Sequence, residues 1–175
     1  MSKDKQWLDF RKEDGAGQTI LRVWWMDLKE NDRAGQAELR RCVDLSDVAF
    51  VPAFHRLRRR LQETDSKFSP LPLAAVAGVT ATIRRDVSSD KLTPGAQLGR
   101  PVGDRPVISE LRFRRLLETA SDLSQRYIAL RRIAAQLENV DLGGFAQAAF
   151  SFPVHLQRQW AYDYYDVTPN QETSK

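Results

Sequence analysis

The sequence has very few of the residues that form covalent cross-links or bind metals. It contains one cysteine, Cys42, and two histidines, His55 and His155. A single thiol excludes an intramolecular disulfide and a zinc site built from several cysteines. The histidines are 100 residues apart and neither belongs to an H-E-x-x-H or H-x-x-x-H spacing. We therefore expect neither a disulfide scaffold nor a metal centre, and no cofactor.

Long apolar segments are also missing. The longest weakly polar stretch, residues 70–83, has 14 residues, which is short of the ~20 that a membrane-spanning helix needs. The first dozen residues are charged throughout and contain no apolar core of a signal peptide. We therefore expect a cytoplasmic protein with no membrane partner.

No arrangement of residues is typical of a catalytic site. Cys42 follows two arginines that could lower its pKa, but a core-facing helix thiol is the better interpretation. The glycine-rich segment 94–103 lacks the G-K-[ST] of a Walker A motif, and no strand precedes it. Asp163 and Asp166 fall at the end of a predicted helix, with no second catalytic group nearby. We expect a protein that is not an enzyme.

Arginine is the residue that the sequence has in excess. There are 27 basic and 23 acidic residues, and 20 of the basic residues are arginines. The planar guanidinium group can hold a phosphate with two hydrogen bonds, whereas lysine acts as a point charge. A GC-rich genome would also favour arginine codons. The distribution is more informative, because residues 33–60 carry a net charge of +4, residues 84–132 carry +5, and residues 133–175 carry −3.

Apolar side chains repeat at helical spacing along most of the chain, and 42% of the residues are hydrophobic, which is enough for a core. No segment has convincing period-2 alternation. We predict an all-α fold, a compact bundle of about seven to eight helices with one Gly/Pro-rich loop over residues 88–106. The expected helices cover residues 19–31, 33–43, 73–87, 142–150 and 154–165, with one more beginning at Pro52 and two strongly amphipathic ones containing residues 113–120 and 123–137.

The predicted domain organisation is simple. Residues 1–16 are polar and end in a glycine-rich stretch, so we expect a flexible leader there. Residues 17–166 form a single helical domain, and residues 167–175 form a flexible tail.

Many arginines fall on helix faces opposite the apolar stripes. Ion pairs at i,i+4 spacing, such as Glu110 with Arg114, explain some of them. They do not explain the run of residues 56–60, where no acid lies nearby before Glu63, and they fit poorly for the exposed pairs 40–41 and 131–132. Because like charges crowded on one surface repel, a polyanion is the expected partner.

Several short segments follow one another in a recognisable order within residues 19–166. They are RAGQAELRRC at 33–42, PAFHRL at 52–57, LGR at 98–100, ISELRFRRLL at 108–117, LRRI at 130–133, and RQWA at 158–161 leading into Tyr164 and Tyr165. In order and spacing they resemble the CasB family, the small subunit of the type I-E CRISPR surveillance complex (Cascade). The Gly143-Gly144 pair and the polar leader before Gln18 depart from the family pattern and leave the helix boundaries there open.

The resemblance implies a small, all-helical, non-enzymatic subunit that is present in two copies per complex and acts in antiviral defence. It implies as partners the other Cascade subunits, a second copy of the chain, the crRNA, and the target DNA with the displaced strand of the R-loop. The matching motifs carry a nucleic-acid-binding role onto Arg40, Arg41, Arg56, Arg100, Arg112, Arg131 and Arg132. Charge alone adds Arg59, Arg60, Arg84, Arg85, Arg115 and Arg158.

We expect these guanidinium groups to contact phosphates and stabilise the R-loop, while the guide RNA reads the sequence. Two alternatives remain. The first is a transcriptional regulator with a helix-turn-helix around Asn31-Asp32, which lacks a typical recognition-helix pattern. The second is a purely structural module whose exposed Trp25, Trp160 and Tyr164-Tyr165 would contact other proteins, although core packing would equally explain these aromatic residues.

Overall fold

The protein is described by a computed structural model that covers residues 5–87 and 92–169, and its regular structure is mostly helical. The all-α prediction is confirmed. The α-helices are α1 (Ala16–Asn31), α2 (Arg33–Arg41), α3 (Pro52–Gln62), α4 (Pro70–Thr80), α5 (Pro94–Gly99), α6 (Glu110–Glu118), α7 (Leu123–Gln136), α8 (Leu142–Phe150) and α9 (Val154–Val167), with a 3-10 helix η1 (Leu45–Phe50) after α2. The strands, two residues each, are β1 (Arg85–Asp86), β2 (Pro101–Val102), β3 (Arg105–Pro106) and β4 (Asn139–Val140).

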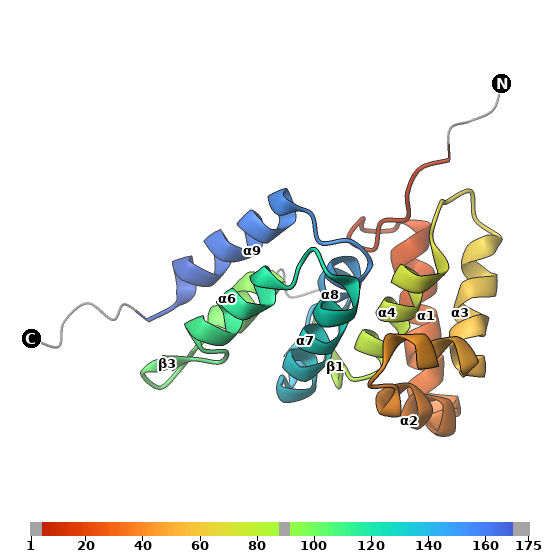
Figure 1. The fold of residues 1–175 in the computed structure, drawn as a ribbon, viewed down its shortest axis with the longest axis horizontal. Helices are drawn as coiled ribbons and strands as arrows, with labels where there is room; N and C mark the ends of the chain where they lie inside the picture. Colours follow the sequence, from red (N-terminus) through yellow and green to blue (C-terminus); the bar gives the residue numbers. More distant parts are fainter. Residues whose placement is uncertain (1–4, 88–91, 170–175) are drawn as a thin grey trace, which may run out of the picture.

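The helices form two groups with α7 and α8 between them (Figure 1). Helices α1 to α4 make up one end of the molecule, while α6 and α9 lie at the other end, where α5 packs against α9. Helix α4 joins the first group to the middle pair, because it packs against η1, α7 and α8. Its residues 73–80 are all buried. A helix that is apolar all round needs neighbours on every side, and α4 therefore becomes the centre of the core.

Short side chains with oxygen atoms fix the beginnings of several helices. Asp32 accepts a hydrogen bond from the backbone N–H of Gly35, Ser109 from Arg112, and Asp122 from Gln125. Such N-caps contribute about 1 kcal/mol each. These caps place the arginine-bearing helices α2, α6 and α7 at defined starting points.

Helix α4 differs from its prediction at both ends. It begins at Pro70, since proline fits the first turn of a helix, and it ends at Thr80 instead of Val87. Beyond that point the carbonyl groups are used by other helices: Trp25 Nε1 donates to Thr80 O at 3.0 Å, and Arg40 Nε donates to Ala81 O at 2.9 Å. The chain then forms β1, which pairs with β4 in parallel.

The predicted loop 88–106 contains regular structure that periodicity could not reveal. Residues 88–91 lie outside the described residues, but α5 and the antiparallel pair β2–β3 follow. The prediction of a loop over the whole segment was therefore wrong. Its glycines allow α5 to approach α9 closely. A Cβ atom on Gly95 would lie 2.2 Å from the carbonyl oxygen of Trp160 on α9.

The leader and the glycine pair are also explained by packing. Leu8 and Phe10 are buried, Leu8 N donates to Lys67 O at 2.9 Å, and Phe10 N donates to the side chain of Gln147 at 2.9 Å. These residues therefore belong to the core, contrary to the expectation of a flexible leader throughout residues 1–16. A Cβ on Gly143, in the first turn of α8, would lie 2.6 Å from Phe10 O. The other domain boundaries stay predictions.

The aromatic residues of the structural-module alternative are mostly interior. Trp25, Trp160 and Tyr164 are buried, and only Tyr165 is exposed. Tyr164 donates from its hydroxyl to Ile108 O at 2.7 Å. Large aromatic residues bury much apolar area, and their polar atoms need a partner when buried. The alternative in which all four face other proteins is therefore wrong for three of them, which pack in the core.

Candidate nucleic-acid interface

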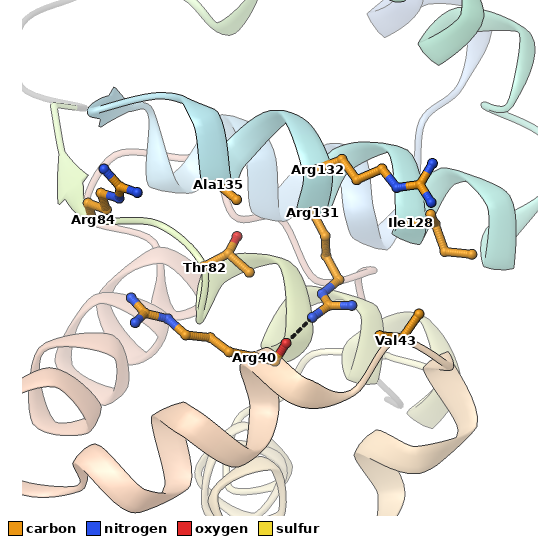
Figure 2. A pocket seen from close by; sticks show the side chains of 8 residues that line it. All are labelled: Arg40, Val43, Thr82, Arg84, Ile128, Arg131, Arg132 and Ala135. Carbon is orange, nitrogen blue, oxygen red and sulfur yellow. Dashed lines mark hydrogen bonds between the residues drawn. The ribbon is translucent and has the colours of Figure 1, made fainter.

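Two neighbouring hollows lie along α7, and arginines line both of them. The first, of about 480 Å³, is lined by Arg40, Val43, Thr82, Arg84, Ile128, Arg131, Arg132 and Ala135 (Figure 2). The second, of about 350 Å³, lies between α6 and α7, and Arg112 and Arg115 contribute to its lining. Both hollows share Ile128 and Arg132. We call this continuous surface the α7 groove.

Three parts of the chain, far apart in sequence, build the first hollow. Helix α7 turns Tyr127, Leu130 and Ala134 into the core. On its other side Arg132 and Ala135 are exposed and Arg131 is half-buried. The end of α2 brings Arg40, and the segment after α4 brings Arg84. Figure 2 places Arg84 at one end of the hollow and Arg132 towards the other, with Arg40 and Arg131 between them.

The charge of the α7 groove has one sign. Four arginines line the first hollow and three line the second, with Arg132 counted in both, and neither lining includes a carboxylate from the described residues. Like charges held close together repel, and a bound anion relieves that repulsion. The arrangement can therefore bind a chain of phosphates.

Two of these arginines, Arg40 and Arg131, are held by hydrogen bonds to backbone carbonyls of the protein itself. Arg131 donates from Nη2 to the backbone carbonyl of Arg40, and its guanidinium carbon lies 5.1 Å from the centre of the Tyr127 ring. The Tyr127 hydroxyl in turn donates to Cys42 O at 2.6 Å. Burial raises the pKa of Tyr127 to about 12, although the positive charge of Arg131 opposes that shift. Arg131 therefore fastens α7 to the end of α2 while it lines the hollow.

A third hollow continues the surface beyond α6. Its volume is about 640 Å³, and it shares Arg112 with the second hollow. Arg105 from β3 and Tyr165 from α9 also line it. Unlike the α7 groove, this hollow includes a carboxylate, Glu110, which accepts a hydrogen bond from the Tyr165 hydroxyl at 3.1 Å.

The structure brings together about half of the arginines predicted to bind nucleic acid. Those that line the α7 groove are Arg40, Arg84, Arg112, Arg115, Arg131 and Arg132. Those outside the three hollows are Arg41, Arg56, Arg59, Arg60, Arg85, Arg100 and Arg158. Arg56 is ion-paired with Asp32, the N-cap of α2, and so joins α3 to α2. The binding roles of both sets stay predictions.

Sequence reasoning missed two arginines with defined places. Arg105 lines the third hollow, but its segment looked like an ordinary loop. Arg126 is only 7% exposed and donates to Ala120 O, just after α6, and to Ala149 O, in the last turn of α8. Burial lowers the pKa of its guanidinium group. The Asp122–Arg126 spacing looks like a surface ion pair, so no signal in the sequence marked Arg126 as interior.

Metal-ligating and thiol side chains of the described residues were the remaining candidates for a reactive site. Among residues 5–87 and 92–169 there is no group of three His, Cys, Asp or Glu side chains that could hold a metal. Cys42 is buried, as expected, and its pKa is raised chiefly by burial, which keeps the thiol protonated. In the same part of the chain, no helix is long and apolar enough to cross a bilayer.

Fold and surface thus describe an all-α protein with an arginine-lined groove. The family model of CRISPR-associated protein Cse2 (CRISPR_cse2) matches residues 35–165. The chain therefore belongs to the Cse2 family, also called CasB, the small subunits of type I-E Cascade. The resemblance inferred from the sequence is confirmed.

A solved structure has a similar fold. It is a chain of the crystal structure of E. coli Cascade bound to a PAM-containing dsDNA target with a 32-nt spacer. The TM-score is 0.63 at 20% sequence identity, over 90% of this chain and 100% of that chain. No curated protein matches this sequence.

Proposed function

We propose that this chain is a non-catalytic subunit of a type I-E CRISPR RNA-guided surveillance complex, and that its α7 groove holds the phosphate backbone of nucleic acid at the R-loop. Membership of the Cse2 family supports the place in the complex. The similar E. coli chain comes from a Cascade bound to target DNA, which supports the proposed contact with nucleic acid. The proposed partners are the other Cascade subunits, a second copy of the chain, the crRNA and the target DNA.

The observation that carries the proposal is the one-sided charge of the α7 groove. Arginines from α2, α6, α7 and the segment after α4 converge there without a carboxylate from the described residues in the lining. A protein that used these arginines only as a solvated surface would gain nothing from bringing them together, because their repulsion costs stability. A polyphosphate backbone removes this cost and gains paired hydrogen bonds from each guanidinium group.

Among the four arginines of the first hollow, Arg84 and Arg132 are the best placed to bind a ligand. Both are exposed, whereas Arg40 and Arg131 already donate to backbone carbonyls. Contacts of this kind fix the position of a strand without reading its bases. Sequence recognition then comes from base pairing with the guide RNA, and the groove stabilises a strand that unwinding has made accessible.

The test compares two double variants in the assembled complex. Arg84→Ala/Arg132→Ala removes two charges from the groove, and Arg33→Ala/Lys67→Ala removes two exposed charges from outside the three hollows. Affinity for target DNA is measured over a range of salt concentrations, and permanganate reactivity of displaced-strand thymines reports the R-loop.

Each lost phosphate contact lowers the salt slope by about 0.7 for a single strand, so the groove variant is expected to lose about 1.4. If the two proteins bind equally at about 1 M salt, a slope difference of about 1.4 makes the variant bind about 50- to 100-fold more weakly at about 50 mM salt. Permanganate reactivity of the displaced strand falls, because a less stable R-loop leaves fewer thymines unpaired. An equal loss in the Arg33/Lys67 variant would contradict the proposal, and sequence-specific operator binding by the isolated chain would favour a transcriptional regulator.

A further inference from the structure

Tyr165 differs from the aromatic residues around it. Its side chain is 49% exposed, whereas Phe113 and Tyr164 are completely buried. The Tyr165 ring meets the Phe113 ring edge-on, with centroids 6.3 Å apart and planes at 79°, and the Tyr164 ring at 5.2 Å and 84°. Its hydroxyl donates to Glu110 Oε1 at 3.1 Å. Ring contacts and hydrogen bond together hold the ring in one orientation, with about half of its surface open.

The exposed ring lies in the third hollow, where charges of both signs are present. Arg105 and Arg112 line this hollow together with Tyr165 and Glu110. The carboxylate of Glu110 repels a phosphate, whereas the two arginines attract one. A ligand that fits both conditions has an uncharged planar part beside Tyr165 and Glu110 and a negative part beside the arginines. A nucleotide has this division between base and phosphate.

We propose that Tyr165 is a stacking platform for one unpaired nucleobase, with the adjoining phosphates held by Arg105 and Arg112. This inference rests on the proposed function, because the strand in the α7 groove would deliver the base. The two sites are continuous, since Arg112 lines both the second and the third hollow. Phosphate contacts position a strand, and the stacked base then selects a strand whose bases are free.

Stacking favours a single strand for a physical reason. Every base has an aromatic face, so stacking is tolerant of sequence, but in a duplex those faces are covered by neighbouring base pairs. The half-exposed ring also binds a base without further loss of side-chain freedom, because Phe113, Tyr164 and Glu110 already hold it. A fixed platform therefore binds an unpaired base at a small entropic cost.

The test uses the full chain and two fluorescein-labelled strands of equal length, oligothymidylate and an abasic strand with the same phosphates. The wild-type chain is expected to bind oligothymidylate about 5- to 150-fold more tightly, the range for stacking of one base. Tyr165→Ala abolishes this preference and leaves abasic-strand affinity and its salt slope unchanged. Tyr165→Phe keeps the preference because it keeps the ring.

Tyr162→Ala is the matched control. Tyr162 lies on the same helix and is 68% exposed, but it does not line the third hollow. We expect this variant to keep the preference for oligothymidylate. Thermal unfolding of each variant shows whether it is folded, and Tyr165→Leu repeats the test with a larger apolar side chain that cannot stack as a ring.

Three outcomes overturn the inference. Equal wild-type affinity for both strands, with a normal salt slope, removes the base contact and leaves the proposed function intact. Loss of affinity for both strands in Tyr165→Ala indicates a structural role for the ring, and a change only in the assembly of the complex indicates a protein contact. If the wild-type chain binds neither strand, both the stacking inference and backbone binding by the free chain are contradicted.

Discussion

Helices α3 and α7 both carry adjacent arginines, yet their surroundings differ. On α3, Arg56 is ion-paired with Asp32 and Arg59 donates weakly to His55 O at 3.4 Å in its own helix. Helix α3 lies at the outer edge of the α1–α4 group (Figure 1). On α7, Arg131 and Arg132 face arginines contributed by α2 and by the segment after α4. The proposed binding surface is therefore assigned where arginines converge from separate elements, and not where they are merely dense along the sequence.

The largest expected effect comes from removing two arginines from the α7 groove and, in a second variant, two arginines from α3. Arg84→Ala/Arg132→Ala is expected to lose about 50- to 100-fold in affinity at low salt, as derived above from the salt slope. Arg59→Ala/Arg60→Ala, which removes the same charge from α3, is expected to lose less than about threefold through long-range electrostatics alone. Both doubles are measured in the assembled complex by the same titration. Similar losses of affinity for the two double variants would show that the arginines of α3 contribute to binding as much as those of the α7 groove.

The second prediction separates neighbouring arginines on α7. Arg131→Ala removes the hydrogen bond to Arg40 O and the contact with the Tyr127 ring. A hydrogen bond from a charged donor is worth about 1.5–3 kcal/mol, and since Arg131 is only half-buried we expect a destabilisation of about 1–2 kcal/mol. Arg132→Ala, at an exposed position, changes stability by less than about 0.5 kcal/mol.

Denaturant unfolding of the two single variants measures this difference. The m-value serves as the control, because an unchanged slope shows that the same surface is exposed on unfolding. Equal stability of the two variants would mean that the Arg131 contacts contribute nothing measurable, and that both arginines are available to a ligand.

The sequence predicts those parts of the fold that have a periodic pattern of apolar residues. Periodic apolar residues predict α7 and α9 well, because each helix buries one face. They do not reveal α5, whose six residues are all buried and whose two glycines allow contact with α9. Leu8 and Phe10 are equally hidden in a polar segment, because two isolated apolar residues have no period.

The arginines of the candidate site show the same difference between local patterns, which the sequence reveals, and long-range contacts, which it does not. Charge blocks and motifs identified Arg131 and Arg132, since both lie opposite an apolar stripe. They could not separate the anchored arginine from the exposed one, because the carbonyl of Arg40 comes from another helix. Nor could they exclude Arg56 from a free surface, because its partner Asp32 is 24 residues away. Long-range contacts of this type have no local pattern.

The last prediction concerns Tyr127, whose ring lies beneath the guanidinium group of Arg131. Among the described residues, no arginine of α3 has a comparable contact with a tyrosine ring. The pKa of Tyr127 is about 12 in the folded protein, against 10.0 for an unperturbed tyrosine. The folded state therefore holds the phenol proton more tightly than the unfolded state does. This contribution to stability is complete below pH 10 and is lost as the pH rises from 10 towards 12.

Tyr127→Phe removes that titration together with the hydrogen bond to Cys42 O. At pH 8 the variant is expected to be about 1 kcal/mol less stable, the typical value of one buried neutral hydrogen bond. Between pH 9 and pH 11 it then loses less stability than the wild type, so the two melting temperatures approach each other. Tyr164, whose pKa is also about 12, titrates in both proteins and leaves a shared alkaline loss. Parallel melting curves across this range would show that Tyr127 does not couple α7 to the end of α2, and the anchored half of the groove would then resemble α3.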